Sequence, residues 1–261
     1  MSTDYETSIT EWHGKRFAHL TAGDGWLNVI GRFWLDDGSV TIGSAADNDL
    51  ILPAGPAHLG TVTQEPALVL FEPADPAQAS VSLVPNPASP PKFSFGSLRF
   101  EVTTMDGRNA LRIRDIDAPE RLNFPGLDYF ATDPNWRITA EWSRLAAPEE
   151  LGIDTVAGVA TTVQVTHLAA FTHDGVRYEL LPTHGTAEKP QFVIRDLTSR
   201  AETYGAARFV YGEDLTENSI VLDFNKAFNP PCAFTDHAVC PLPPPQNVLP
   251  FRIEAGEKRP N

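Results

Sequence analysis

The sequence predicts an all-β protein in which an N-terminal β-sandwich is followed by a C-terminal β-barrel closed by a proline-rich strap. Three observations support this fold class. Short alternating segments rich in β-branched and aromatic residues recur along the chain, each bounded by Gly, Pro, Asn or Asp. Two Asp-Gly pairs, at residues 106–107 and 174–175, separate such segments and are typical of tight hairpin turns. Helical periodicity is confined to residues 4–16 and 133–136.

The predicted strands succeed one another with short connections. In the first part of the chain they are WLNVIGRFWL, SVTIGS, DLILP, LGTVTQ, ALVLFEP, SVSLVPN, KFSFGSLRFEVTTM, NALRIRDI and WRITAEWSRL. In the second part they are GVATTVQVTHLAAFTH, VRYELLPTH, QFVIRDL, AARFVYGE and SIVLDFN. The segment PEELGID, residues 148–154, separates the two series, so we predict an N-terminal part over residues 1–150 and a C-terminal part over residues 151–261. This boundary is soft, and a single unit is the alternative.

The last strand runs into a segment that can be neither a helix nor a regular strand. Residues 220–258 hold seven of the 23 prolines and both cysteines. Proline fixes φ, lacks an amide donor and keeps the preceding residue extended. We therefore expect residues 230–245 to form an ordered strap docked on the barrel, with Cys232 largely buried.

Charge and composition limit the partners. Lys and Arg number 20 against 34 Asp and Glu, a formal net charge of −14, which disfavours nucleic acid and anionic membranes as partners. No apolar run approaches the roughly 20 residues that span a bilayer. The N-terminus lacks the basic and apolar regions of a secretory signal. Two cysteines in 261 residues fit a reducing compartment. These features predict a cytoplasmic protein, and they leave its oligomeric state open.

One local resemblance lies in residues 38–62, GSVTIGSAADNDLILPAGPAHLGTV. This stretch resembles the central hairpin of a forkhead-associated domain, a sandwich that reads phosphothreonine peptides. That family has an Arg directly after the glycine and a later Ser-Arg-x-His. Here Ser44 follows Gly43, and the later stretch is Ala57 to Gly60. Because arginine clusters hold phosphate, the resemblance implies sandwich topology without phosphothreonine binding.

A broader resemblance covers nearly the whole chain. The sequence is similar to a bacterial family catalogued as domain of unknown function 1684, which implies no particular activity. One departure is His237, where the family usually has an aromatic residue. The segments that carry the resemblance are residues 26–53, 126–130, 133–134, 136–137, 192–196, 203–205, 208–209, 222–225, 229–234 and 240–244.

Polar residues of the second part form the principal candidate site. Alternation places Asp223 and Asn225 on one face of their strand. Two arginines facing an acid and amides in a barrel mouth suit a small anionic or carboxylate-bearing molecule. The alternative is an internal salt-bridge network, with Asp196 among its members, that ties the strap to the barrel. The candidate ligand-binding residues are Arg195, Tyr204, Arg208, Asp223, Asn225, Asn229 and Cys232.

The cysteines leave three alternatives open. Cys232, His237 and Cys240 have the spacing C-x4-H-x2-C and could ligate a metal. They could also provide a disulfide or redox pair, or two small buried side chains that anchor the strap. Catalysis by Cys232 would need a base, for which His237 and His184 are the candidates, and an orienting group such as Asn229.

Two segments are rich in aromatic residues, and the chain lacks the common cofactor and catalytic motifs. The aromatics of WLNVIGRFW and FPGLDYFATDPNW are expected in the core, with a pocket lining as the alternative. No glycine-rich phosphate loop, H-E-x-x-H or G-x-S-x-G is present, so no cofactor is predicted. The leading hypothesis is binding of a small polar or anionic organic molecule at the junction of barrel and strap. An enzyme using Cys232 or a metal, and a non-catalytic interaction module, are the alternatives. A pocket below about 300 Å³ would favour the module.

Overall fold

The structure, a computed structural model that describes residues 3–260, divides into two compact units. Unit 1 comprises Met1–Ala18 and Pro125–Asn261, and unit 2 comprises His19–Phe124. Unit 2 is therefore inserted in the sequence between the N-terminal helix and the rest of unit 1. The predicted boundary at residue 150 lies inside one long strand, Arg137–Ile153. Pro148, in the segment used to place that boundary, interrupts the register of this strand without ending it.

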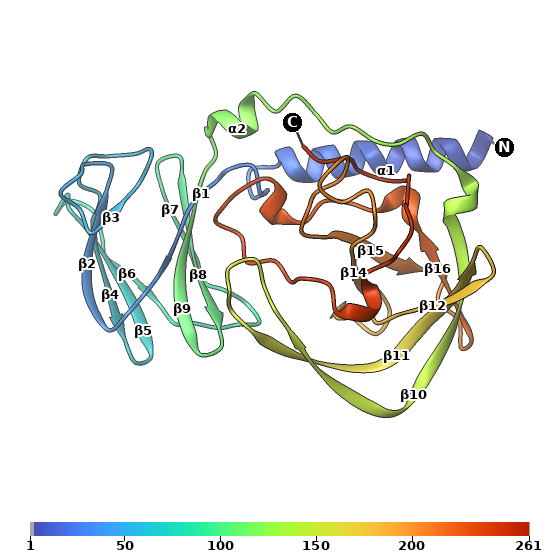
Figure 1. The fold of residues 1–261 in the computed structure, drawn as a ribbon. Helices are drawn as coiled ribbons and strands as arrows, with labels where there is room; N and C mark the ends of the chain where they lie inside the picture. Colours follow the sequence, from blue (N-terminus) through green and yellow to red (C-terminus); the bar gives the residue numbers. More distant parts are fainter. Residues whose placement is uncertain (1–2, 261) are drawn as a thin grey trace. The chain divides into compact units, whose positions relative to one another are not determined.

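Unit 2 contains two sheets that share one hydrophobic core (Figure 1). One sheet is antiparallel with the order β1-β9-β8-β7, and the other has the order β3-β2-β4-β5-β6. Leu98, Phe100 and Leu111 from the first sheet pack with Ile42 and Phe71 from the second. The strands are β1 (Val29–Trp34), β2 (Gly38–Gly43), β3 (Leu50–Ile51), β4 (Gly60–Glu65), β5 (Leu68–Pro73), β6 (Val81–Leu83), β7 (Lys92–Phe95), β8 (Leu98–Met105) and β9 (Arg108–Asp115), followed by the short helix α2 (Pro119–Leu122).

The forkhead-like stretch contributes β2, β3 and the start of β4. Strand β2 pairs in parallel with β3 and antiparallel with β4. Asp49 holds the connection between β2 and β3, because its carboxylate accepts hydrogen bonds from the amide and the hydroxyl of Thr41, both at 2.8 Å. Ser44 donates to the carbonyl of Gly55 at 2.9 Å. The resemblance to a forkhead-associated hairpin stays a prediction.

Unit 1 is built on a seven-stranded antiparallel sheet with the order β12-β11-β10-β16-β15-β14-β13. Its elements are α1 (Thr3–Thr21, of which residues up to 18 belong to this unit), η1 (Pro134–Trp136), β10 (Arg137–Ile153), β11 (Thr161–His173), β12 (Val176–Leu180), β13 (His184–Gly185), β14 (Pro190–Ile194), β15 (Arg208–Glu213), β16 (Ser219–Asp223), η2 (Phe224–Lys226), η3 (Pro231–Ala233) and η4 (Pro245–Asn247). Strand β12 and the two-residue β13 are the two edges of this sheet. Among residues 3–260, these two strands do not pair with each other. The sheet is therefore open, and the predicted closed barrel is not what the chain forms, since closure requires the edge strands to pair.

The two faces of this sheet are covered by different segments. On one face the main core of unit 1 brings Trp142, Phe171 and Phe192 together with Leu249 and Ile253 from the C-terminal segment. Helix α1 lies along unit 1 in Figure 1, and its Trp12 ring is 6.3 Å from the ring of Phe228, which packs on Phe209 of β15. The all-β prediction is confirmed at the level of class, and the predicted helix at residues 4–16 lies within α1.

The proline-rich strap is ordered and docked on unit 1. The amide of Val156 donates to the carbonyl of Cys240 at 2.9 Å. The amide of Leu242 donates to the carbonyl of Asp154 at 2.8 Å. The strap thereby satisfies backbone groups at the end of the β10–β11 hairpin. Both Asp-Gly turns have positive φ at the two central residues, as the predicted tight hairpins require.

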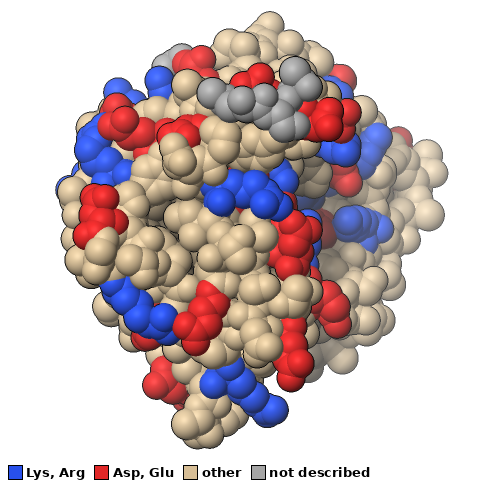
Figure 2. Space-filling view, turned by 90° about the vertical axis from the view of Figure 1, so that its right-hand side faces the viewer, with Lys and Arg blue, Asp and Glu red and all other residues tan. Residues whose placement is uncertain are grey.

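The surface of the protein mixes both signs of charge. Figure 2 shows Lys and Arg side chains interspersed with Asp and Glu on the face that it draws. Within residues 3–260, no helix has the combination of length and apolar character that crossing a bilayer requires.

Candidate functional site

Arg208 and Asp196 form a buried ion pair in unit 1. The side chain of Arg208 is 2% exposed, and its guanidinium lies 3.4 Å from the Asp196 carboxylate. It also donates to the carbonyls of Ile253 (3.0 Å) and Ala255. Burial lowers the pKa of Arg208, and the neighbouring Asp196 opposes that shift. Asp196 accepts further hydrogen bonds from the amide of Ile253 and the hydroxyl of Thr198. These contacts tie strand β15 to residues 253–255, which lie beyond the strap of residues 230–245 that the salt-bridge alternative concerned.

Asp223 and Asn225 belong to a different buried cluster, which the N-terminal helix completes. The hydroxyl of Tyr5 on α1 donates to the two carboxylate oxygens of Asp223 at 2.9 and 3.1 Å. The amide of Asn225 donates to the same carboxylate at 3.1 Å, and its side chain bridges to the backbone of Asp133. Asp223 and Asn225 are 1% and 2% exposed. Asp223 ends strand β16 and Asn225 lies in the 3-10 helix η2, so the two do not share one face of a strand, and their partners are protein groups other than Arg208.

Asn229 is held by the C-terminus. Its amide donates to the carboxylate of Glu257 at 2.7 Å, and its side-chain amide donates to the carbonyl of Lys258 at 2.7 Å. Arg16 of α1 donates to Glu257 at 2.7 Å and to the carbonyl of Asn229 at 2.9 Å. The sequence analysis missed Tyr5, Arg16 and Glu257. The signal available was the polar face of the predicted N-terminal helix, but nothing in the sequence indicated its partners.

The remaining candidates surround the strap. The hydroxyl of Tyr204 donates to the carbonyl of Cys232 at 3.0 Å. The amide of Cys232 donates to the Sγ of Cys240 at 3.2 Å, and both thiols are free. Cys240 is buried, whereas Cys232, which we expect to be largely buried, is half-buried. Arg195 borders a separate hollow of about 230 Å³ with Asp154 and residues 242–245. Whether any of the seven predicted residues contacts a ligand stays a prediction.

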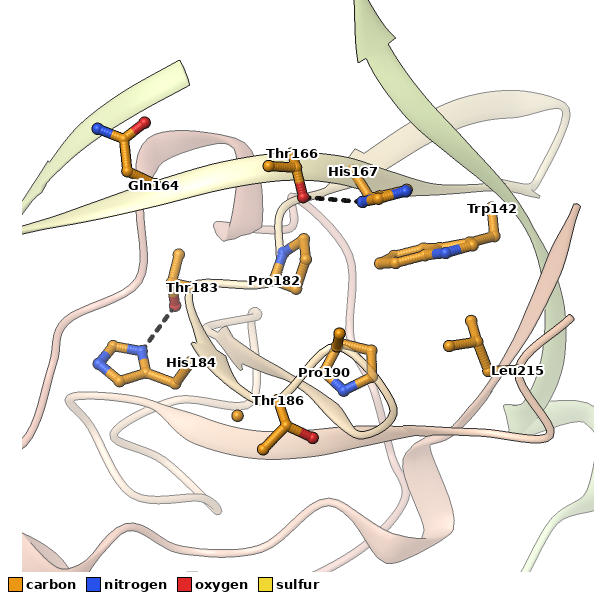
Figure 3. Close-up of a pocket in the computed structure, with 12 residues that line it drawn as sticks. Trp142, Gln164, Thr166, His167, Pro182, Thr183, His184, Thr186, Pro190 and Leu215 are labelled. Atoms are coloured by element: carbon orange, nitrogen blue, oxygen red, sulfur yellow. Dashed lines mark hydrogen bonds between the residues drawn. The ribbon is translucent and has the colours of Figure 1, made fainter. Parts of the chain in front are cut away.

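The metal alternative finds no support in the geometry. Among the described residues, no group of three or more His, Cys, Asp and Glu side chains could hold an ion. The backbone amide of His237 donates a hydrogen bond to the hydroxyl of Thr235 at 3.2 Å. The Nδ1 of His184, a candidate base for Cys232, lies within hydrogen-bonding distance of the Thr183 hydroxyl (Figure 3).

A larger hollow of about 440 Å³ lies beneath the β10–β11 hairpin of unit 1. Figure 3 shows Gln164, Thr166 and His167 of β11 along one side, His184 and Pro190 along the other, and Trp142 with Leu215 at one end. Twelve residues line it: Trp142, Gln164, Thr166, His167, Pro182, Thr183, His184, Gly185, Thr186, Ala187, Pro190 and Leu215. We call this space the hairpin cavity.

An irregularity in the hairpin shapes this cavity. The β10–β11 register shifts so that Leu145 to Pro148 face Thr166 alone. In a regular strand the consecutive side chains of Thr166 and His167 would lie on opposite faces. At the shift both line the cavity, and their side chains hydrogen-bond at 2.8 Å. Bulges re-aim side chains in this way and are frequent beside functional sites.

Aromatic stacking and burial fix the cavity's two imidazoles. The ring of His167 lies parallel to that of Trp142, with centroids 5.0 Å apart and 5° between the planes. The Nδ1 of His184 is 3.0 Å from the hydroxyl of Thr183, and burial lowers the pKa of His184. His184 is therefore neutral at neutral pH. None of the twelve lining residues is Asp, Glu, Lys or Arg, so the cavity offers uncharged hydrogen-bonding groups beside aromatic and proline surface.

The sequence analysis missed this cavity. Trp142 and His167 lie in two of the predicted strands, and nothing in those segments indicated that the two side chains line one space. The available signal was Pro148 inside a strand, because proline cannot donate to a sheet ladder and marks a bulge or an edge.

Comparisons with known proteins define the relatives of unit 1. A family model described as "Protein of unknown function (DUF1684)" matches residues 122–258. No curated protein matches the chain. Among solved structures, the chain is similar to the solution NMR structure of an uncharacterized protein from Haloarcula marismortui. The two are 32% identical over 53% of this chain and 79% of the other, with a TM-score of 0.43. The resemblance predicted for the whole chain is thus supported for residues 122–258.

Proposed function

We propose, for a chain that belongs to the DUF1684 family of proteins of unknown function, that it binds a small polar organic molecule in the hairpin cavity. The observation that carries the proposal is the combination of volume and lining. A space of about 440 Å³ falls in the range of ligand pockets and exceeds the size below which a pure interaction module is favoured. Imidazole, amide and hydroxyl groups converge on it beside Trp142.

The lining also limits the ligand's chemistry. Without a fixed charge among the twelve residues, the cavity favours an uncharged or weakly anionic molecule with hydrogen-bonding edges and one apolar face. A strongly charged ligand would lose its hydration without gaining an ion pair. The site therefore differs from the predicted junction of barrel and strap, where Arg208 and Asp223 have protein partners. The cytoplasm of a bacterium stays the predicted setting.

Ligand-observed NMR tests the proposal. The probes are a mixture of small neutral aromatic amides, alcohols and monocarboxylic acids, screened against the wild type and two variants. Ala187→Trp places a large side chain at the lining, whereas Ala201→Trp makes the same change in an exposed turn outside it. We expect hits with the wild type and Ala201→Trp that disappear with Ala187→Trp. Hits that survive Ala187→Trp, or their absence from the wild type, would refute the proposal.

One observation favours a second candidate, a reversible thiol pair. The thiol of Cys240 donates a hydrogen bond that lowers the pKa of the Cys232 thiol, against the effect of burial. The same contact, with burial, raises the pKa of Cys240. The thiolate of Cys232 could attack hydrogen peroxide to give a sulfenic acid and water. The sulfur of Cys240 would then displace a second water to form the disulfide, so two thiols lose two hydrogens in all.

Mass spectrometry after peroxide treatment tests this second candidate. We expect a loss of two hydrogens that is reversed by a dithiol reductant and absent from Cys240→Ala. Accumulation of oxygenated Cys232 in the wild type, without a disulfide, would exclude the pair as a redox couple.

A further inference from the structure

The basic residues of unit 2 are concentrated on one surface. Unit 2 contains seven Lys and Arg against thirteen Asp and Glu. Six of the seven lie on the strands of the sheet β1-β9-β8-β7, on the side away from the core: Arg32, Lys92, Arg99, Arg108, Arg112 and Arg114. We call this surface the basic face.

Strand alternation produces this arrangement. Leu111 and Ile113 point into the core of unit 2, so Arg112 and Arg114 point the other way. Arg32 of β1 lies directly opposite Arg112 of β9 in the register. Because like charges placed opposite each other across a sheet are destabilising, this pairing costs stability that a neutral partner would not.

The acidic groups on the basic face are too few to balance it. Glu101 accepts hydrogen bonds from Arg112 at 2.8 Å and Arg114 at 2.9 Å, and its other oxygen lies 3.5 Å from the Nζ of Lys92. One buried carboxylate thus serves three cations. Its pKa is lowered by the two arginines, although burial acts in the opposite direction.

Two further arginines have no carboxylate partner. Within residues 3–260, no acid lies within ion-pair distance of Arg32, whose guanidinium instead stacks over Trp34 at 4.1 Å. Burial and the neighbouring Arg112 lower the pKa of Arg32. Arg99 donates to the carbonyls of Gly96 at 2.8 Å and Leu98 at 3.0 Å, and it too has no ion pair in that range. A guanidinium without a carboxylate partner keeps its forked donors available for an anion.

A hollow in unit 2 brings three of these cations together. Its volume is about 360 Å³, and Lys92, Arg99 and Arg114 line it together with Phe93 and Ser94. Asp24 and Glu101 also line it, along with Gly23, Phe100 and Ile116. The lining therefore combines the guanidinium groups of Arg99 and Arg114 with apolar side chains. Planar guanidinium groups match phosphate oxygens two at a time, which an ammonium group cannot do.

We infer that the basic face of unit 2 is a binding site for a small, multiply charged phosphorylated molecule, seated in the hollow between Lys92, Arg99 and Arg114. A compact ligand fits the charge distribution better than nucleic acid. Screening confines the field of the basic face to roughly 8–10 Å at physiological salt. The net charge of −14 on the chain would also repel a long polyanion that extends beyond the hollow. The site is independent of the hairpin cavity, because it uses residues of unit 2 alone.

Isothermal titration calorimetry with inorganic pyrophosphate, at low salt and on the full chain, tests this inference. The variant Arg99→Gln removes a cation of the hollow and leaves the Glu101 cluster intact. Its control, Arg177→Gln, makes the same charge change on an exposed arginine of unit 1. We expect Arg99→Gln to weaken pyrophosphate binding about tenfold and Arg177→Gln to change it less than about twofold. Circular dichroism confirms that both variants are folded.

Three results would overturn the inference. The first is no heat of binding to pyrophosphate or tripolyphosphate. The second is an equal loss of affinity in the two variants, which would indicate only a response to net charge. The third is tighter binding of citrate or of a short DNA duplex than of pyrophosphate, because the hollow would then not select compact phosphate. Weakening of pyrophosphate binding by added salt in the wild type is a further expected result.

Discussion

Replacement of Asp223 with alanine should lower the free energy of unfolding by about 2–4 kcal/mol, because the change leaves buried donors without an acceptor. Asp223 is 1% exposed, and it accepts hydrogen bonds from the hydroxyl of Tyr5 and the amide of Asn225. Each hydrogen bond to a charged group contributes about 1.5–3 kcal/mol, but some donors keep another partner. The side-chain amide of Asn225 still reaches Asp133, and Lys226 keeps Glu213 at 2.6 Å.

Calorimetry of four variants separates this cluster from general charge effects. For a chain of this size, the loss corresponds to a fall in Tm of roughly 5–15 °C. Tyr5→Phe should cost about 1–2 kcal/mol, since it removes one hydroxyl and leaves the carboxylate its other donors. The double variant of Asp223→Ala and Tyr5→Phe should lose about 1 kcal/mol less free energy of unfolding than the two single variants lose together, because both changes remove the same hydrogen bond. Glu217→Ala, an exposed acid in a turn, should stay within about 0.5 kcal/mol of the wild type. If Asp223→Ala melts like Glu217→Ala, the helix does not depend on this cluster and the reasoning is wrong.

Three further predictions concern packing, ionisation and recognition. Gly43→Ala should destabilise unit 2 by about 1–3 kcal/mol in urea unfolding, because its Cβ would lie 2.2 Å from the carbonyl oxygen of Ala57. In the control variant Gly152→Ala, the added Cβ has no heavy atom within 4 Å, so this change should not destabilise the protein in the same assay. Burial raises the pKa of Tyr129 and of Tyr204. Their contribution to stability is therefore complete below about pH 10 and lost as the pH rises above it, so unfolding at alkaline pH should coincide with a rise in phenolate absorbance. Phosphothreonine peptides should not bind at Ser44, because serine lacks the paired N–H donors with which an arginine holds phosphate. Micromolar binding of such a peptide that is abolished by Ser44→Ala would contradict this prediction.

The sequence was sufficient to predict local structure but not how distant segments meet. Alternation and the Asp-Gly pairs predicted most strands, since the period of two and the turn chemistry are properties of neighbouring residues. Sheet closure depends on whether β12 and β13 meet, and no local pattern encodes that. The candidate residues were predicted from their polar side chains, but their partners were not: Asp223 pairs with a tyrosine 218 residues away, and Arg208 pairs with Asp196 and with backbone carbonyls. Pro148 was read as the edge of a domain, whereas it marks the bulge beside the hairpin cavity.

The insertion of unit 2 within unit 1 has a consequence for biosynthesis. Helix α1 is synthesised before unit 2 and before the rest of unit 1, yet Arg16 bonds to Glu257, 241 residues later. At about 5–20 residues per second, translation separates the two by roughly 10–50 s. Unit 2 has its whole sequence available during that interval and can fold, while the helix that precedes it has nothing to dock on. A nascent chain stalled before Glu257 would therefore expose α1 to chaperones and proteases, and synthesis of the segment that contains Glu257 would let the helix dock.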